Sequence, residues 1–195
     1  LALTALPKDG EKQYLRTPAK RLYDGAFVYS RYKTEDVDGV QLVNLLPLED
    51  YIAGVVPYEI SPTWDYEALR AFAVTVRSYT ARNRRRHRDY GFDVCNTTHC
   101  QVYRGIGSAN DNVYAAVAAT KGMVLTYEGE IVPAYYSSST GGYTAGGNDT
   151  WGGSEAAYLT PTRTPWERYS EYANGLWSVE VDAAELAEHL RNKGY

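Results

Sequence analysis

Glu59 is the residue of this sequence best suited to acid–base chemistry. It is the one carboxylate in the apolar and aromatic segment GVVPYEISP, residues 54–62. Apolar surroundings remove water from a carboxyl group and disfavour its ionised form, which makes a glutamic acid a usable general acid near neutral pH. A solvated Glu at the edge of a loop is the alternative interpretation, because charged residues are mostly exposed.

A second set of reactive side chains lies in the segment CNTTHC, residues 95–100, and in a histidine that precedes it. Thiolates and imidazoles are the usual ligands of tetrahedral zinc, and four of them complete a closed structural site. The four candidate ligands are His87, Cys95, His99 and Cys100. Two alternatives remain open: a Cys95–Cys100 disulfide, which requires an oxidising compartment, and a pair of buried free thiols.

Small hydroxyl-bearing residues and glycines dominate residues 137–153. Their hydroxyl groups and exposed backbone amides suit hydrogen bonds to the N-acetyl and hydroxyl groups of a glycan. A serine nucleophile would need a paired base. Two of the three histidines are better explained as metal ligands, and His189 lies on a predicted C-terminal helix. A flexible loop without a ligand is the remaining interpretation.

The composition limits the class of protein. With 195 residues, 44% of them hydrophobic and 23% charged, the chain can form an ordinary globular core. The net charge of −4 does not favour a nucleic-acid partner. No apolar run approaches the ~20 residues that span a bilayer, so a membrane anchor would lie outside this sequence. The 19 Tyr against 3 Phe suit either stacking on sugar rings or half-buried strand positions.

Hydrophobic patterning predicts an α+β fold, in which antiparallel hairpins and a few helices surround a substrate groove. Strands are predicted at residues 26–30, 40–46, 123–127 and 131–136. Helices are predicted at residues 48–56, 65–84, 110–120 and 182–192. We expect residues 1–12 to form a loose terminus and the chain to form a single domain over residues 1–195.

Local signals position the elements around the acid/base candidate. Pro47 is suited to open the helix that leads to Glu59. Asp65 can cap the main helix, whose apolar stripe includes Phe72 and Val76. Glu59 is therefore expected just past a short helix, ahead of a Ser-Pro-Thr break that separates it from the main helix.

The segment LEDYIAGVVPYEISPTWDYEALRAFAVTVRSYTA, residues 48–81, resembles the signature of the stage II sporulation protein D (SpoIID/LytB) family. The family pattern is roughly LEDYL-x-GVVP-x-EM, followed by W-x-x-EALKAQA and RTYA. Further segments resemble later family motifs in the same order: CQVYRG at residues 100–105, YSSSTGGYT at 136–144, and WGG…YL…PWE within 151–167. Together the ordered set covers residues 48–167.

The resemblance implies lytic transglycosylase activity on peptidoglycan glycan strands already stripped of their stem peptides. The catalytic Glu of the GVVP-x-E motif corresponds to Glu59. As an acid it would protonate the glycosidic oxygen that leaves C1 of N-acetylmuramic acid (MurNAc). As a carboxylate it would then take the proton of that sugar's C6 hydroxyl, which closes a 1,6-anhydro ring. No water attacks, so the second carboxylate of an ordinary glycosidase is not required.

The resemblance also implies a structural zinc ion at the Cys/His segment and no cofactor for catalysis. The implied location is the bacterial cell envelope outside the cytoplasm, where the protein would be membrane-anchored or secreted. Glycan strands would be its ligand, and a cell-wall amidase is a candidate partner. We expect family sequence to continue beyond Tyr195.

The expected glycan contacts lie near Glu59 and in the serine-rich segment. They are Arg77, Gln101, Tyr103, Ser137, Ser138, Ser139, Gly141, Gly142 and Thr144. A surface arginine is the alternative for Arg77. The sequence departs from the family at Phe72, where KAQA has Gln, and at Ile60, where Met follows the catalytic Glu. Because Phe72 lies on an apolar stripe, we interpret it as a core substitution.

Two other functions remain open. A non-catalytic glycan-binding or assembly module would keep the groove without turnover. A hydrolytic muramidase would place a second carboxylate near Glu59, for which Asp65, Asp149 and Glu155 are the candidates. The products distinguish these functions, because only a lytic transglycosylase releases 1,6-anhydro ends.

Overall fold

The computed structural model describes the chain except for residues 6–10, 34, 153–155, 170–177 and 195. The chain divides into two compact units, Leu1–Tyr136 and Ser137–Tyr195. That both belong to a single domain stays a prediction. Helices and small antiparallel sheets are mixed, which confirms the predicted α+β class. Among the described residues, no helix combines the length and the apolar character needed to cross a bilayer.

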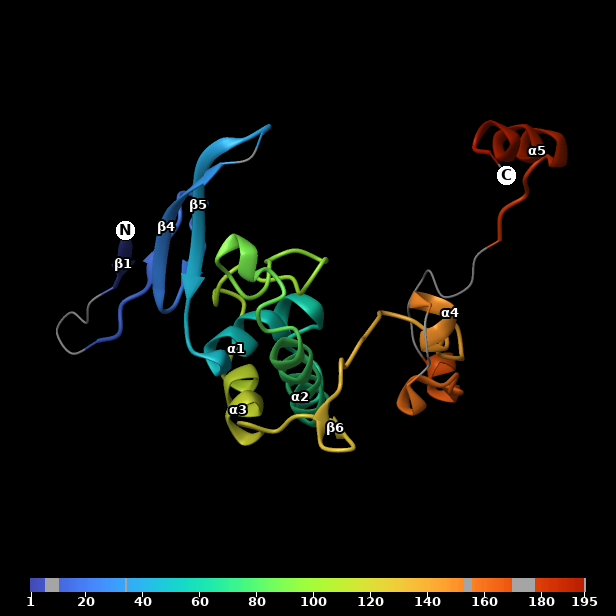
Figure 1. The fold of residues 1–195 in the computed structure, drawn as a ribbon. Helices are drawn as coiled ribbons and strands as arrows, with labels where there is room; N and C mark the ends of the chain where they lie inside the picture. The colour runs from blue at the N-terminus through green and yellow to red at the C-terminus, as the bar shows by residue number, and fades with distance from the viewer. Residues whose placement is uncertain (6–10, 34, 153–155, 170–177, 195) are drawn as a thin grey trace. The chain divides into compact units, whose positions relative to one another are not determined.

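A three-stranded antiparallel sheet of order β1-β4-β5 lies in the first unit (Figure 1). β4 (Ala26–Lys33) and β5 (Asp38–Leu45) form a hairpin, and each includes residues outside its predicted bounds. β1 (Ala2–Thr4) pairs with β4 inside the stretch expected to be loose. The unpaired backbone groups at the β4 edge account for this pairing. Residues 6–10 of that stretch lie outside the described residues.

Two further ladders in the first unit are short. β2 (Leu15–Arg16) pairs with β3 (Leu22–Tyr23). β6 (Thr126–Tyr127) pairs with β7 (Glu130–Ile131), where the sequence predicted two longer strands. Pro133 explains the short β7, because proline has no N–H to donate to a ladder.

Three helices form the core of the first unit (Figure 1). They are α1 (Leu48–Glu59), α2 (Tyr66–Arg82) and α3 (Asp111–Ala119). Ile52, Leu69 and Val113, one from each helix, are fully buried against one another. α1 runs three residues further than predicted and includes Pro57 in its last turn, where proline removes one helical hydrogen bond.

The predicted cap of the main helix is confirmed, and a second helix is capped in the same way. The Asp65 side chain accepts a hydrogen bond from the Glu67 backbone N–H at the start of α2. In the second unit, Asp182 accepts from the first turn of α5 (Ala183–Asn192) in the same way. The remaining elements are short: η1 (Arg88–Tyr90) in the first unit, and α4 (Gly147–Trp151), η2 (Ala157–Leu159) and η3 (Pro165–Tyr169) in the second.

A buried ion pair ties the three core helices together. Arg77 on α2 is only 1% exposed, and its Nη2 donates to Glu49 Oε2 in the first turn of α1 at 2.7 Å. The same guanidinium donates to the carbonyl oxygens of Val117 on α3 and of Met123 beyond it. Positive charge is favoured at a helix C-terminus, where carbonyl groups lack partners. Arg77 therefore holds α1, α2 and α3 in one arrangement.

Glu49→Ala should lower the free energy of unfolding of the first unit by about 3 kcal/mol, because it leaves the buried Arg77 charge without its partner. Urea denaturation followed by far-ultraviolet circular dichroism measures the change. Glu67→Ala is the matched control, since Glu67 pairs with Arg70 at the surface and is 69% exposed. The control should cost roughly 0–1 kcal/mol. If the two variants lose equal free energy of unfolding, the Glu49–Arg77 pair stabilises the first unit no more than a surface ion pair does.

Candidate functional site

Glu59 lies in a cavity rather than on an open surface. It is half-buried at the last residue of α1, and its Oε1 accepts a hydrogen bond of 2.7 Å from the Val102 backbone N–H. The cavity has a volume of about 260 Å³. Its lining residues are Glu59, Tyr79, Thr98, Cys100, Tyr135 and Tyr136. One carboxylate oxygen is thus fixed by the backbone, in a largely aromatic surrounding.

The loop that carries Val102 is attached to α2 through Gln101. Gln101 is 1% exposed, and its Oε1 accepts a hydrogen bond of 2.7 Å from Thr80 Oγ1. Its Nε2 donates to the Val76 carbonyl oxygen and to Tyr136 Oη, each at 3.4 Å. A buried amide with all its groups bonded resists movement. Gln101 therefore positions the cavity wall from behind, instead of facing the cavity as a glycan ligand.

Tyr103 is also part of the core. It is 5% exposed, and its hydroxyl donates to Asn44 Oδ1 on β5 at 2.7 Å. Its ring packs against Tyr51 with centroids 5.1 Å apart. On α1, a Cβ atom added to Gly54 would lie 2.5 Å from Tyr103 Cε2, so this close approach requires glycine.

Arg77, Gln101 and Tyr103 were expected to contact a glycan, but all three are used inside the fold. Each has its polar groups bonded to protein partners, as described above. We therefore assign them to the support of the site. Residue type alone did not separate a buried polar side chain from one that faces a ligand.

Three tyrosines in the cavity wall were not among the predicted site residues. Tyr79 lies on α2, and Tyr135 and Tyr136 follow β7. Burial raises the pKa of the Tyr136 phenol; the Gln101 hydrogen bond opposes this rise and the Glu59 charge adds to it. Burial likewise raises the pKa of Tyr79. Both side chains are therefore neutral hydrogen-bonding groups near pH 7. The high tyrosine content was the sequence signal for them.

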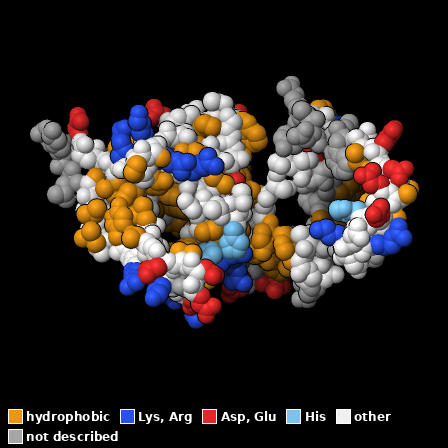
Figure 2. Space-filling view, turned by 90° about the horizontal axis from the view of Figure 1, so that it is seen from above, with side chains coloured by type: hydrophobic (Ala, Val, Ile, Leu, Met, Phe, Trp, Pro, Cys, Tyr) orange, Lys and Arg blue, Asp and Glu red, His pale blue; other side chains and the backbone are white. Residues whose placement is uncertain are grey.

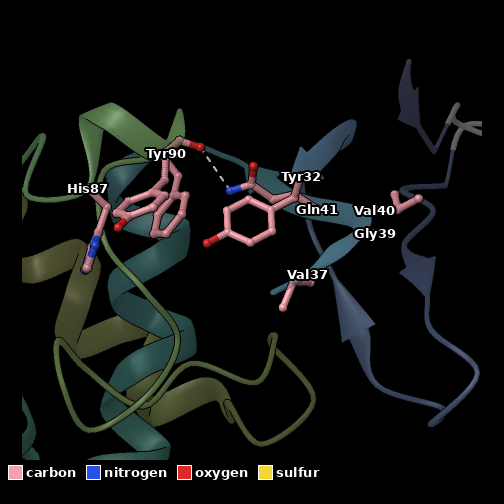
Figure 3. A pocket seen from close by; sticks show the side chains of 8 residues that line it. Tyr32, Val37, Gly39, Val40, Gln41, His87 and Tyr90 are labelled. Carbon is pink, nitrogen blue, oxygen red and sulfur yellow. Dashed lines mark hydrogen bonds between the residues drawn. The ribbon is translucent and has the colours of Figure 1, made fainter. Parts of the chain in front are cut away.

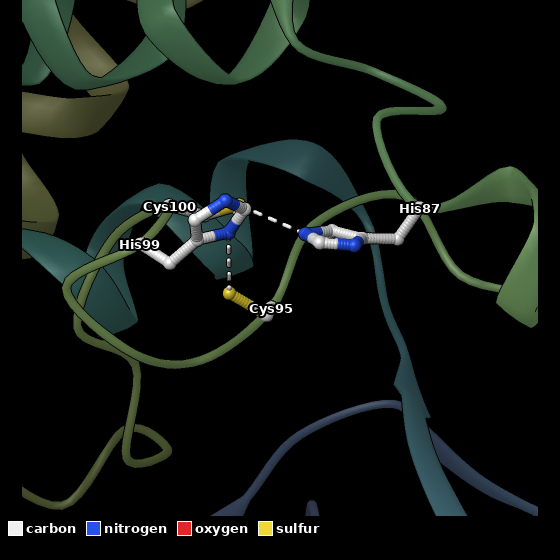
Figure 4. Close-up of side chains that lie close together, drawn as sticks. All are labelled: His87, Cys95, His99 and Cys100. Carbon is white, nitrogen blue, oxygen red and sulfur yellow. Dashed lines mark hydrogen bonds between the residues drawn. The ribbon is translucent and has the colours of Figure 1, made fainter.

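The four predicted metal ligands form one cluster (Figure 4). Their ligand atoms all lie within 4.8 Å of one another. His99 Nδ1 is 3.6 Å from Cys95 Sγ and 3.7 Å from Cys100 Sγ, and Cys100 Sγ is 3.4 Å from His87 Nε2. Tetrahedral zinc with bonds of 2.0–2.3 Å separates its S and N ligands by about 3.6 Å. The cluster therefore has the ligands and the spacing to hold a metal ion.

Both cysteines are free thiols in this cluster, not a disulfide. Although burial opposes ionisation, hydrogen bonds from Thr97 and His99 lower the pKa of the Cys95 thiol to about 6. Burial raises the pKa of Cys100. The thiolate is the form that binds metal, so Cys95 is already prepared as a ligand at neutral pH.

The cluster contributes one ligand to the wall of each of two cavities. Cys100 lines the Glu59 cavity, and His87 lines a second cavity of about 340 Å³ (Figure 3). This second cavity is lined by Tyr32, Val37, Gly39, Val40, Gln41, His87, Tyr90 and Phe92. His87 stacks on Phe92 at 4.9 Å, and Gln41 Nε2 donates to the Tyr90 carbonyl oxygen at 3.0 Å. Histidine side chains are exposed on the face of the molecule shown in Figure 2.

Residues 36–127, which hold Glu59 and the Cys/His cluster, match the model of the stage II sporulation protein (SpoIID) family. The chain is 31% identical over 145 residues to stage II sporulation protein D of Bacillus subtilis, covering 67% of this chain and 42% of that protein. The chain belongs to the SpoIID family. The match to the family model spans the acid/base motif and the metal ligands and ends before the serine-rich segment.

Two other relatives carry names other than stage II sporulation protein D. The chain is 44% identical over 135 residues to the amidase enhancer of Bacillus subtilis, covering 69% of this chain and 18% of that protein. It is 34% identical over 174 residues to an uncharacterized protein of Brachyspira hyodysenteriae, covering 84% of this chain and 46% of that protein. The chain thus spans less than half the length of these SpoIID relatives.

The serine-rich segment belongs to the second unit, where Glu167 organises it. Glu167 accepts hydrogen bonds from the backbone N–H groups of Thr140 and Gly142 at 2.5 and 2.6 Å, and from Thr140 Oγ1 at 2.9 Å. Gly141 and Gly142 have φ of 67° and 99°, which glycine adopts without strain. Two backbone amides of the segment, one of them that of the expected contact Gly142, are therefore already bonded to Glu167. Its meeting with Glu59 in one groove stays a prediction.

The other expected residues of this segment have short-range partners or open surroundings. Ser137 Oγ donates to the Ser139 carbonyl oxygen, and Thr144 Oγ1 accepts from the Thr162 backbone N–H. Ser138 is exposed. Of the second carboxylates considered for a muramidase, Asp65 is used as a helix cap, Asp149 lies on α4 of the second unit, and Glu155 lies outside the described residues.

The Glu167 contacts predict a pH dependence for this segment. The Thr140 and Gly142 N–H groups hold the pKa of Glu167 at about 2, below the ~4.3 of a free glutamate. A lowered folded-state pKa means that the carboxylate stabilises the segment above about pH 4 and that this support is lost as pH falls through about 2. A carbon-13 NMR titration of Glu167 should have its midpoint near 2.

Glu167→Gln should reduce hydrogen-exchange protection of the Thr140 and Gly142 amides by about tenfold or more, because charge-assisted hydrogen bonds are lost. Glu188→Gln on α5, in the same unit, is the control and should leave both amides unchanged. A titration midpoint near 4 together with unchanged protection in Glu167→Gln contradicts this arrangement.

Proposed function

We propose that the chain is a peptidoglycan lytic transglycosylase with Glu59 as general acid and then general base. The observation that carries the proposal is the half-buried Glu59 carboxyl group, held by the Val102 N–H inside an aromatic-lined cavity. Aromatic faces suit sugar rings, and a partly desolvated carboxyl group suits proton donation. The bond cleaved would be the MurNAc–GlcNAc linkage of strands stripped of stem peptides.

The hydrogen bond to Oε1 leaves Oε2 to carry the transferred proton. Glu59 would donate this proton to the departing glycosidic oxygen and would afterwards accept the proton of the C6 hydroxyl on the same MurNAc. That hydroxyl oxygen attacks C1, so the ring closes without water. Glu59 is the one carboxylate among the described residues that line the cavity, which favours this route over hydrolysis with two carboxylates.

The similarity to an amidase enhancer supports two further parts of the proposal. The first is a cell-wall amidase as partner, since removal of stem peptides would supply the peptide-free strands that this site is proposed to cleave. The second is an extracytoplasmic location in the cell envelope, where such strands are found. The same similarity keeps a second candidate open: a glycan-binding or assembly module without turnover.

We also propose that zinc is the metal of the Cys/His cluster. Two thiolates and two imidazoles form a closed tetrahedral set, which is typical of structural zinc and leaves no position for an activated water. The ion would supply rigidity: Cys100 precedes the two residues that fix the cavity wall and Glu59. The proposed cleavage uses no metal-bound group.

Glu59→Gln should keep the fold and glycan binding but slow cleavage of purified peptide-free glycan strands by about 10²–10⁴-fold, because the acid and base are removed. Mass spectrometry of the products measures the release of 1,6-anhydro ends. Glu67→Gln, an exposed carboxylate on α2, is the control and should stay within about twofold of wild type.

The products also separate the candidate functions. Reducing ends would indicate a muramidase, and bound but intact strands would indicate the assembly module. Wild-type turnover in Glu59→Gln is incompatible with Glu59 as the acid/base.

Elemental analysis of the purified protein should find about one zinc ion per chain. Removal of the ion with a chelator should lower the melting temperature, because a bound ion stabilises only the folded state. Cys95→Ser should lose most of the zinc, whereas His189→Ala, on α5 outside the cluster, should retain it. Equal zinc content in these two variants argues against the cluster as the binding site.

A further inference from the structure

The orientation of the Gln101 side-chain amide is determined by its neighbours. The Val76 carbonyl oxygen can only accept a hydrogen bond, so Gln101 Nε2 must face it. The Gln101 Oε1 then faces Thr80 Oγ1 at 2.7 Å. That hydroxyl also lies 2.8 Å from the Val76 carbonyl oxygen and has one proton for the two acceptors. The same NH₂ group that faces Val76 also donates to Tyr136 Oη at 3.4 Å. With Nε2 toward the Val76 carbonyl oxygen, the Gln101 amide is a donor to Tyr136 Oη.

The direction of the Tyr136 hydroxyl proton follows from this network. Because Gln101 Nε2 donates to Tyr136 Oη, the proton of that hydroxyl cannot point at Gln101. Tyr136 and Glu59 line the same cavity, and interaction with the Glu59 carboxyl group is among the influences on the Tyr136 phenol. Glu59 is the one carboxylate among the described residues that line this cavity, and a carboxylate is the strongest acceptor there for the Tyr136 hydroxyl. The ring itself is held edge-on to Phe72, with centroids 5.1 Å apart.

We propose that the Tyr136 hydroxyl, oriented by Gln101, donates a hydrogen bond to the Glu59 carboxylate and holds it in the geometry needed for cleavage. Tyr136 and Gln101 are then positioning residues that act through Glu59. This inference rests on the proposed function, and it adds residues that the acid/base motif does not contain. It also gives Phe72 a role, since its ring supports Tyr136 where the family pattern has Gln.

The Glu59 carboxyl group needs a second contact because Glu59 lies at the end of α1. Glu59 is the last helical residue, and its carboxyl group is held by the backbone through one oxygen only. A single hydrogen bond leaves rotation about that contact, whereas two contacts from different elements fix the plane of the carboxyl group. Misplacement of a reacting group by about 1 Å can cost about 100-fold in rate. A second contact at this place therefore affects turnover more than binding.

Tyr136→Phe tests the proposal, because it removes the hydroxyl and keeps the ring on Phe72. We expect kcat for the release of 1,6-anhydro ends to fall by about 10–100-fold, with KM changed by less than about threefold. Tyr29→Phe is the control: it removes a half-buried phenol hydroxyl from β4, outside the Glu59 cavity, and should leave both constants unchanged. Wild-type kcat in Tyr136→Phe overturns the proposal.

A readout independent of turnover separates this inference from the proposed function. The carbon-13 chemical shift of the Glu59 carboxyl carbon at neutral pH should change in Tyr136→Phe and not in Tyr29→Phe. If wild type releases no 1,6-anhydro ends but the shift changes, the enzymatic function fails and the contact stands. An unchanged shift in Tyr136→Phe overturns the contact, whatever the activity of the wild type.

A double-mutant cycle tests whether Gln101 acts through Tyr136. Gln101→Met keeps the side-chain length and should lower kcat in the wild-type background, but by less than about twofold in the Tyr136→Phe background. Additive losses show that Gln101 does not act through Tyr136. If Gln101→Met does not fold, Thr80→Val removes the hydroxyl that bonds Gln101 Oε1 and is carried through the same cycle with the same two outcomes.

Discussion

The hydrogen bond from the Val102 backbone amide to Glu59 is the contact on which the rest of the site depends. Three consecutive residues of one loop hold the Val102 amide in place for this hydrogen bond. Cys100 belongs to the metal-ligand cluster, Gln101 is bonded to α2, and Val102 presents its N–H to the carboxyl group. A loop without regular structure is thereby fixed at each of three positions, so that its backbone can serve as a rigid donor.

Helix α1, which carries Glu59 at its C-terminal end, is also fixed at its N-terminal end. Glu59 ends α1, and Glu49 in the first turn of the same helix pairs with the buried Arg77. Because α1 is held at both ends, the carboxyl group keeps its place relative to the loop. The sequence motif around Glu59 therefore depends on a charge ten residues before it and on a helix that follows it.

Local signals allowed much of the fold to be predicted, because a cap or a turn is determined by neighbouring residues. Asp65 caps its helix as expected, the helix predicted at residues 182–192 is present, and His87 joins the cysteine segment. The tertiary uses of Arg77 and Gln101 were not predictable, since whether a polar side chain faces a ligand or a buried partner depends on distant residues. The edge pairing of β1 likewise depends on β4, which lies some twenty residues later.

The close approach of Tyr103 to Gly54 has a consequence for how the GVVP-x-E motif is interpreted. The first and last residues of the motif have different roles. Gly54 leaves space for the Tyr103 ring, and Glu59 performs the proposed proton transfer. The glycine is thus tied to a ring almost fifty positions further along the chain. A larger side chain at position 54 requires a smaller one at position 103, so these two positions should change together in functional relatives.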